Sequence, residues 1–258
     1  MIDFTTLAFL SGAALLAGFV DSIAGGGGLL ALPALLLVGF DPVAALATNK
    51  LQGSFGTASA TYAYWKKGHV DLRSIWKAVV TTFIAAMLGV AAIHVAPTNL
   101  LKAILPIILI LIALYFAFAP RLSSDSSHPW LSPNLMNFAV LPTIGFYDGI
   151  FGPGTGSFFL LALVTLSGSG LIAATGKTKL LNFTSNIAAL IAFAFTGKIL
   201  WVVGLCMGVA QVIGAQAGSH MAMKNGAKII RPLLVVVCCA VAVKLLLDPS
   251  NPITALFP

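Results

Sequence analysis

Ten apolar segments, separated by short polar loops, dominate this sequence of 258 residues. Hydrophobic residues make up 59% of the chain and charged residues 8%, with no glutamate, which is not the composition of a soluble domain. The segments do not alternate apolar and polar residues as transmembrane β-strands do. The sequence therefore predicts an all-α polytopic membrane protein. The segments cover about residues 4–23, 28–40, 43–65, 74–96, 100–119, 135–151, 155–167, 171–195, 200–222 and 228–247.

The polar stretch RLSSDSSHPWLSPNL, residues 120–134, divides the chain into two similar halves. An internal repeat in a polytopic protein is typical of transporters. We predict a first membrane repeat over residues 1–119, a cytoplasmic linker over 120–134 and a second membrane repeat over 135–258. The matching pairs, 126 to 129 residues apart, are Gly18 and Gly145, Asp21 and Asp148, Ile23 and Ile150, Gly25 and Gly152, Gly27 and Gly154, Lys50 and Lys179, Leu51 and Leu180, Gly68 and Gly197, Gly89 and Gly218, Lys102 and Lys228, and Pro106 and Pro232.

The basic loops indicate that the two repeats are inverted. Loop 66–77 holds four basic residues and loop 220–231 holds three, so both should face the cytoplasm. The first loop follows the third segment of its half and the second follows the fourth, so the halves must have opposite orientations. We expect an odd number of crossings in each half, or three crossings beside a re-entrant hairpin. The net charge of +7 then reflects membrane topology, and we expect no nucleic acid partner.

Two glycine-rich stretches, GFVDSIAGGGG at 18–28 and GFYDGIFGPGTG at 145–156, interrupt the apolar segments. The segments after them, 28–40 and 155–167, span only about 20 Å as helices, whereas the hydrocarbon core is about 30 Å thick. Each repeat should therefore contain a broken or re-entrant helix near the membrane midplane.

Irregular backbone at that depth lies inside the protein or lines a cavity, and a helix that begins there attracts anions. Close helix packing is the alternative reason for the glycines. The residues predicted to bind substrate here are Gly25, Gly26, Gly27, Gly28, Gly152, Gly154, Thr155 and Gly156.

Two aspartates, Asp21 and Asp148, and two repeat-related lysines, Lys50 and Lys179, lie within the predicted membrane segments. Charged residues at that depth are expensive and mark function by default. In KTKLLNFTSN, residues 178, 182, 185 and 186 share one helical face. The lysines and their polar neighbours form a second predicted substrate-binding set: Thr48, Asn49, Lys50, Gln52, Thr178, Lys179, Asn182, Ser185 and Asn186.

The sequence leaves open what these charges do. In an oxyanion site the lysines would supply charge, and amides, hydroxyls and backbone N–H groups would supply directed donors. In a structural arrangement, an aspartate and a lysine would neutralise each other within each half. Either aspartate, Asp21 or Asp148, could also take up a proton and couple transport to a gradient.

The sequence resembles the TauE/SafE family of sulfite exporters, in particular its inner-membrane branch of probable membrane transporters. The resemblance implies outward movement of sulfite, a sulfonate or another small organosulfur anion across the bacterial cytoplasmic membrane, through about eight spans. It covers nearly the whole chain and rests on GFVDSIAGGGGLLALPAL (18–35), AALATNKLQ (44–52), GFYDGIFGPGTGSF (145–158) and KLLNFTSNIAAL (179–190).

The leading hypothesis is therefore a secondary transporter, not an enzyme, that works by alternating access between the lipid-embedded repeats. An intramembrane aspartyl protease is the runner-up, because two carboxylates that share a proton could activate water. An anion channel is a third reading. We expect no metal, because the histidines form no ligand-spaced set, and no cofactor; no P-loop is present. Whether the chain forms a homo-oligomer is left open.

Overall fold

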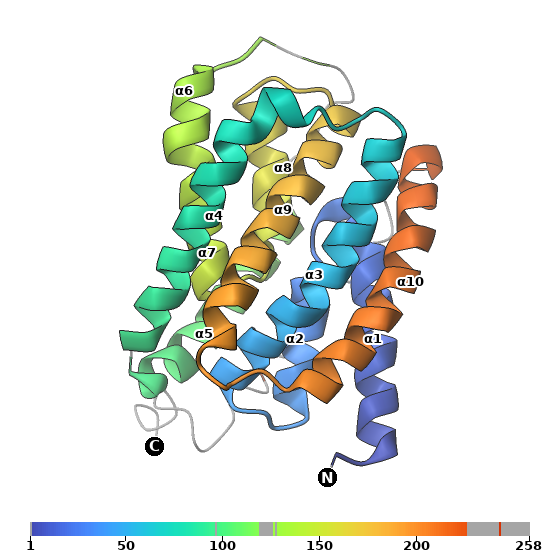
Figure 1. The fold of residues 1–258 in the computed structure, drawn as a ribbon, viewed down its shortest axis with the longest axis vertical. Coiled ribbons are helices and arrows are strands. Elements are labelled where there is room, and N and C mark those ends of the chain that lie inside the picture. Colours follow the sequence, from blue (N-terminus) through green and yellow to red (C-terminus); the bar gives the residue numbers. More distant parts are fainter. Residues whose placement is uncertain (1, 96, 119–125, 127, 226–242, 244–258) are drawn as a thin grey trace.

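The computed structural model describes residues 2–95, 97–118, 126, 128–225 and 243, and within these ranges it contains helices and no strands. Figure 1 shows the helices running roughly along one long axis. The last predicted segment, 228–247, and most of the linker lie outside the described residues. The elements are α1 (Phe4–Ala24), α2 (Gly28–Leu37), α3 (Pro42–Lys66), α4 (Leu72–Val95), α5 (Thr98–Phe118), α6 (Pro133–Leu135), the π-helix η1 (Met136–Val140), α7 (Leu141–Ile150), α8 (Thr155–Thr165), α9 (Leu171–Ala194) and α10 (Trp201–Asn225).

Three helices begin where the sequence provides a capping side chain. The carboxylate of Asp3 accepts the amide of Thr6, and that of Asp41 accepts the amides of Val43 and Ala44. Ser132 caps α6 in the same way, and both α3 and α6 have proline in the first turn. These side chains satisfy amides that have no partner within the helix.

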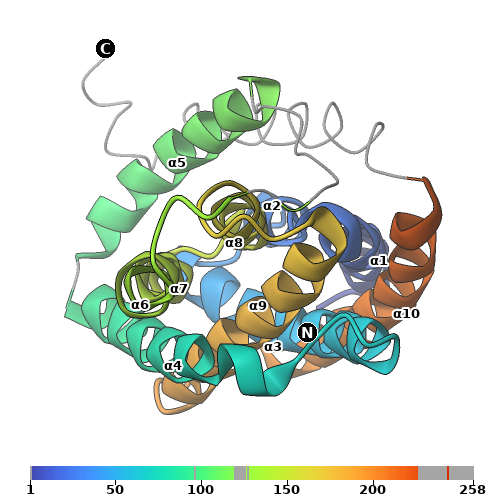
Figure 2. The same ribbon diagram turned by 90° about the horizontal axis from the view of Figure 1, so that it is seen from above.

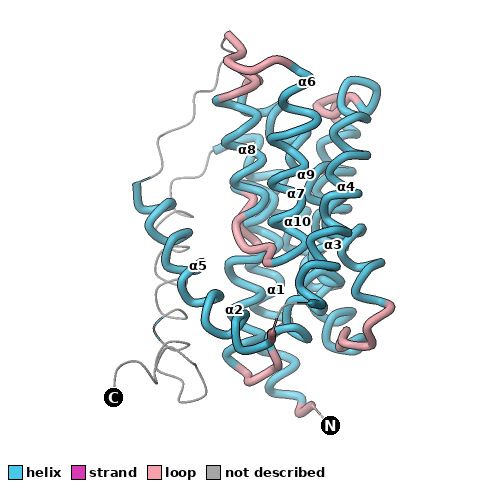
Figure 3. The backbone as a smooth tube through the Cα atoms, turned by 90° about the vertical axis from the view of Figure 1, so that its left-hand side faces the viewer, coloured by secondary structure: helices cyan, strands magenta, loops and turns pink. Residues whose placement is uncertain are grey.

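Helices α1 and α2 form a hairpin that opens toward the lower end of Figure 1, whereas α7 and α8 open toward the upper end. The amides of Trp130, before α6, and Leu131 both donate to the carbonyl of Leu166, after α8, at 3.0 and 3.1 Å. These bonds place the two ends of the second hairpin side by side. The loops at the hairpin tips lie near the middle of the long axis (Figure 3). Two broken helix pairs, as predicted, are thus present.

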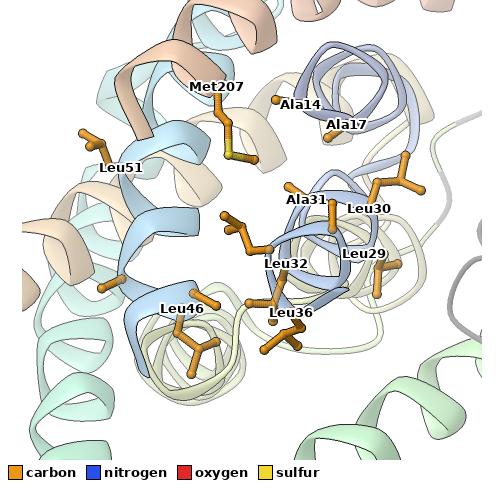
Figure 4. Packing of buried hydrophobic residues seen from close by; sticks show 14 of the residues in the cluster. Ala14, Ala17, Leu29, Leu30, Ala31, Leu32, Leu36, Leu46, Leu51 and Met207 are labelled. Atoms are coloured by element: carbon orange, nitrogen blue, oxygen red, sulfur yellow. The ribbon is translucent and has the colours of Figure 1, made fainter. Parts of the chain in front are cut away.

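The short helices α2 and α8 lie inside the bundle, as Figure 2 shows from above. They contain 10 and 11 residues, about 15 Å of helix, which is too short to cross a membrane. A helix that is apolar on every side is stable only when it is surrounded. Figure 4 shows leucines of α2 in one buried cluster with Ala14 and Ala17 of α1, Leu46 of α3 and Met207 of α10.

The long helices pack reciprocally. Helix α1 packs against α10, and α7 packs against α4, while α3 and α9 cross at the centre. Glycines permit the close approach in both pairs. A Cβ on Gly218 would overlap the Phe19 carbonyl oxygen, and one on Gly89 would overlap the Phe146 carbonyl oxygen. These four residues are two repeat-related pairs, so the two interfaces are built alike.

The outer surface of the bundle is apolar. Among the described residues, three helices, α1, α4 and α10, are long and apolar enough to cross a membrane. Large side chains at intervals of four residues line the outer faces of α4 and α10, where lipid tails would solvate them as well as a protein core would. On α4 and α10 these are Trp76, Val80, Ile84, Leu88, Leu205, Val209 and Ile213.

Candidate functional site

The two glycine turns meet inside the bundle. Helix α1 ends at Ala24, and the residue that caps it, Gly25, has φ 79° and donates its amide to the Asp21 carbonyl. The backbone of Gly25 lies directly against Gly156 at the start of α8, so that a Cβ on Gly156 would lie 2.6 Å from the Gly25 oxygen. Gly28 in turn faces the backbone of Gly152 and Pro153. The glycines thus bring two backbone segments from different halves into contact.

Two buried ion pairs cross between the halves at this point. Lys50 Nζ on α3 lies 2.8 Å from Asp148 Oδ1 on α7. Lys179 Nζ on α9 lies 3.7 Å from Asp21 Oδ2 on α1, and it also donates to the Asp21 carbonyl. The alternative of a structural pair within each half is therefore wrong. The lysine of each half neutralises the aspartate of the other because the α3–α9 crossing places each lysine beside the opposite turn.

All four charged side chains are almost completely buried. Their exposed fractions are between 0 and 4%. Removing such charges from water costs several kcal/mol per ion, so each group depends on its partner. Asp21 also anchors its own turn, because its Oδ1 accepts the Gly27 amide at 3.2 Å. At the second turn, a Cβ on Gly152 would lie 3.4 Å from Asp148 Oδ1.

A polar cavity of about 320 Å³, counting its opening, lies beside the ion pairs. Only a small part of it is wide enough for a water molecule, so a larger substrate requires the surrounding helices to separate. Both halves contribute lining residues: Asp21, Gly25, Gly28, Asn49, Gln52, Gly53 and Thr57 from the first, and Asp148, Gly152, Gly156, Asn182, Asn186 and Gln211 from the second.

The amides that line the cavity are held in place by one another. Gln52 Nε2 on α3 donates to Asn49 Oδ1 at 2.8 Å, and Asn186 Nδ2 on α9 donates to the Asn182 carbonyl at 2.8 Å. Gly53 lies against the Asn186 amide, where a Cβ would be 3.2 Å from Oδ1. The polar stripe predicted on α9 therefore meets its counterpart on α3.

Nine of the predicted site residues do not line the cavity. Lys50 and Lys179 contact the aspartates that line it, and Ser185 donates to the Asn182 carbonyl instead. The Thr178 hydroxyl is buried without a hydrogen-bond partner in the described structure. The others outside the lining are Gly26, Gly27, Thr48, Gly154 and Thr155.

Thr48 has a structural role that its sequence position did not reveal. Its hydroxyl accepts the amide of Leu200, just before α10, at 3.0 Å. We expect Thr48→Val to lower the free energy of unfolding by about 1–2 kcal/mol, because this amide loses its acceptor. The midpoint of thermal unfolding in detergent measures the effect, and transport per folded protein should persist. Lost transport at unchanged stability would instead make Thr48 a binding residue.

Three lining residues, Gly53, Thr57 and Gln211, were missed by the sequence analysis. Gln211 is 2% exposed and lies in the middle of α10, where it packs on Gly18 and Gly56. A polar side chain within an otherwise apolar membrane segment was the signal that could have identified it. In the part of the chain that the structure describes, no three His, Cys, Asp or Glu side chains gather as a metal site requires.

Comparison with known proteins identifies the family. The family described as Sulfite exporter TauE/SafE matches residues 10–245. The chain belongs to the TauE/SafE family. Its TauE/SafE relatives include the Probable membrane transporter protein ORF9 of Sinorhizobium sp, 51% identical over 252 residues, which are 98% of this chain and 97% of the relative. The resemblance expected from the sequence is thus confirmed.

Two further TauE/SafE relatives carry similar descriptions. The Probable membrane transporter protein YfcA of Escherichia coli strain K12 is 43% identical over 250 residues, 96% of this chain and 92% of its own. A Probable membrane transporter protein of Haemophilus influenzae is 41% identical over 247 residues, 96% of each chain. No solved structure matches significantly. This TauE/SafE chain is therefore a membrane transporter of that family.

Proposed function

We propose that the protein is a secondary transporter that exports a small anion, such as sulfite or a sulfonate, across the bacterial cytoplasmic membrane. The observation that carries the proposal is the pair of ion pairs that cross between the halves, Lys50 with Asp148 and Lys179 with Asp21, beside a polar cavity. Each lysine is a buried cation whose partner lines the cavity. An incoming anion can replace that carboxylate as the counter-ion of the lysine.

The reciprocal packing supports inverted repeats. Helix α1 packs against α10 as α7 packs against α4, and the two hairpins open toward opposite ends of the molecule (Figure 1). In this arrangement α3, α4 and α5 cross the membrane. The hairpin α1–α2 returns to the side from which it entered, although α1 alone is long enough to cross. Such symmetry lets one half rock against the other about a site between them, which is alternating access.

The distribution of charges supports the proposed orientation. Exposed basic residues gather at the upper end of Figure 1, around the α3–α4 loop: Lys66, Lys67, Arg73 and Lys77. The opposite end carries Asp3, Asp41 and Lys198. By the positive-inside rule the upper end faces the cytoplasm.

The narrow cavity fits the carrier mechanism better than an open channel. A channel needs a continuous wide path, whereas this cavity must enlarge before it admits an anion. The ion pairs likewise do not favour a protease. The two carboxylates of an aspartyl protease share one proton, whereas Asp21 and Asp148 each have their own lysine partner.

Efflux from liposomes tests the proposal. Purified protein in liposomes loaded with sulfite, or in parallel with methanesulfonate, should release the anion faster than protein-free liposomes, with a rate that saturates. The double variant Lys50→Ala/Lys179→Ala should lose this efflux, because neither ammonium remains to bind the anion. Thr48→Val, which alters a buried hydroxyl outside the cavity, is the matched control.

The outcomes separate the parts of the proposal. Efflux of only one anion identifies the substrate, and a rate that never saturates indicates a channel. If neither anion leaves the liposomes faster than from protein-free controls, this substrate class is wrong for the protein.

A further inference from the structure

The described residues leave four oxygens at the cavity without a hydrogen-bond donor, although one of them, Asp21 Oδ2, lies 3.7 Å from Lys179 Nζ in the ion pair. Asp21 Oδ2, Asp148 Oδ2, Gln52 Oε1 and Gln211 Oε1 are buried and accept no hydrogen bond from the described residues. All four residues line the same cavity and are between 1 and 4% exposed. An oxygen buried without a donor costs about 1–3 kcal/mol, more if it is charged. A naked anion would add acceptors to this set and satisfy none of them.

We propose that the cavity binds a monovalent cation together with the transported anion, through the oxygens of Asp21, Gln52, Asp148 and Gln211. Carboxylate and amide oxygens are ligands that suit a sodium ion. They also accept a hydrogen bond from a carboxyl group that has taken up a proton. The inference rests on the proposed anion transport and adds the coupling ion to it.

Charge balance gives the cation its place in the cycle. Asp21 and Asp148 line the cavity from α1 and α7, and their partners Lys179 and Lys50 lie behind them on α9 and α3, so the four charges sum to zero. Helix α10 contributes only the neutral Gln211. When an anion pairs with a lysine, it displaces the carboxylate that was the counter-ion of that lysine. A cation bound to the displaced carboxylate restores neutrality. For a monovalent anion, such as a sulfonate or hydrogen sulfite, a divalent ion would leave an excess charge in a medium that strongly disfavours one.

Sodium and proton gradients distinguish the two sources of the cation. Liposomes are loaded with the anion that the wild type carries in the assay above. One series has sodium inside and choline outside at equal pH, and the other has a pH gradient in sodium-free buffer. Faster efflux with outward sodium identifies a sodium ion, and faster efflux with outward protons alone identifies a proton. Efflux that ignores both gradients overturns the proposal, and the oxygens are then merely hydrated.

Glutamine variants test the site itself. Gln52→Leu and Gln211→Leu should each raise the cation concentration for half-maximal efflux about tenfold, equivalent to about 1.4 kcal/mol. Gln216→Leu is the matched control on α10, because the Gln216 amide donates to Ser59 and lies outside the cavity. If the control shifts as much as Gln211→Leu, the effect is structural and the site is wrong.

A binding measurement keeps the test independent of transport. Sodium chloride should raise the thermal unfolding midpoint of the wild type in detergent more than choline chloride does, because a bound ion stabilises the folded state. If a proton is the ion, acidification should stabilise the wild type more than Gln211→Leu in sodium-free buffer. No ion-dependent difference between wild type and variant would overturn the site even where anion efflux is intact. Absence of all anion efflux would instead count against the proposed function.

Discussion

Replacing Lys50 by methionine should lower the free energy of unfolding by about 3–5 kcal/mol, because Asp148 is left as a buried charge without a partner. Anion efflux should fall to the level of protein-free liposomes. Titration with SDS in detergent micelles measures the stability. Lys198→Met, at an exposed position in the α9–α10 turn, should change stability by no more than about 0.5 kcal/mol.

A double-mutant cycle tests the crossed pairing directly. The variant Lys50→Met/Asp148→Leu should recover most of the lost stability, because no buried charge is left alone. In contrast, Lys50→Met/Asp21→Leu should lose about the sum of the two single effects, since these residues belong to different pairs. Recovery in the second variant and not in the first would show that the pairs form within each half. Neither double variant should transport.

Replacing Gly25 by alanine should lower the free energy of unfolding by about 3 kcal/mol or more. Gly25 has φ 79°, which costs an L-residue about 1–2 kcal/mol, and its Cβ would overlap the backbone at Gly156. Overpacking of that kind costs a further 1–3 kcal/mol, approximately, and would push the two turns apart. Transport should be lost as well, because the turns and the ion pairs share this contact.

Gly39→Ala separates backbone strain from the clash. Gly39 has φ 88°, but nothing lies within 4 Å of an added Cβ. It should therefore show only the strain, about 1–2 kcal/mol, and should transport normally. Equal losses at Gly25 and Gly39 would mean that the contact between the turns has no energetic role.

Much of the fold could be predicted from the sequence because its causes are local. Apolar segments of sufficient length become helices in lipid, and Asp3 and Asp41 mark where two of them begin. The apolar segments that follow the two glycine runs are too short to cross the membrane, and this predicted the two broken helix pairs that the structure contains. The lysines, aspartates and amides were recognised because polar groups are costly in an apolar segment.

The cavity was harder to predict, because its lining depends on which helix faces lie opposite each other. Asn182 and Asn186 line it, whereas Thr178 and Ser185 of the same predicted stripe do not. Sequence spacing assigns residues to a helical face, and it does not say which part of that face meets a cavity and which part meets another helix.

What the sequence by itself determined is the inventory: a TauE/SafE chain of apolar helices with two glycine turns and two lysine–aspartate sets. Only the tertiary structure decided the partners. The crossing of α3 and α9 pairs Lys50 with Asp148 and Lys179 with Asp21. The packing of α10 on α1 brings Gln211 to the cavity. Such contacts join residues about 100 to 200 positions apart, and ion pairs of either kind would neutralise the same four charges. The choice between them comes from the way the two halves pack, which no local pattern encodes.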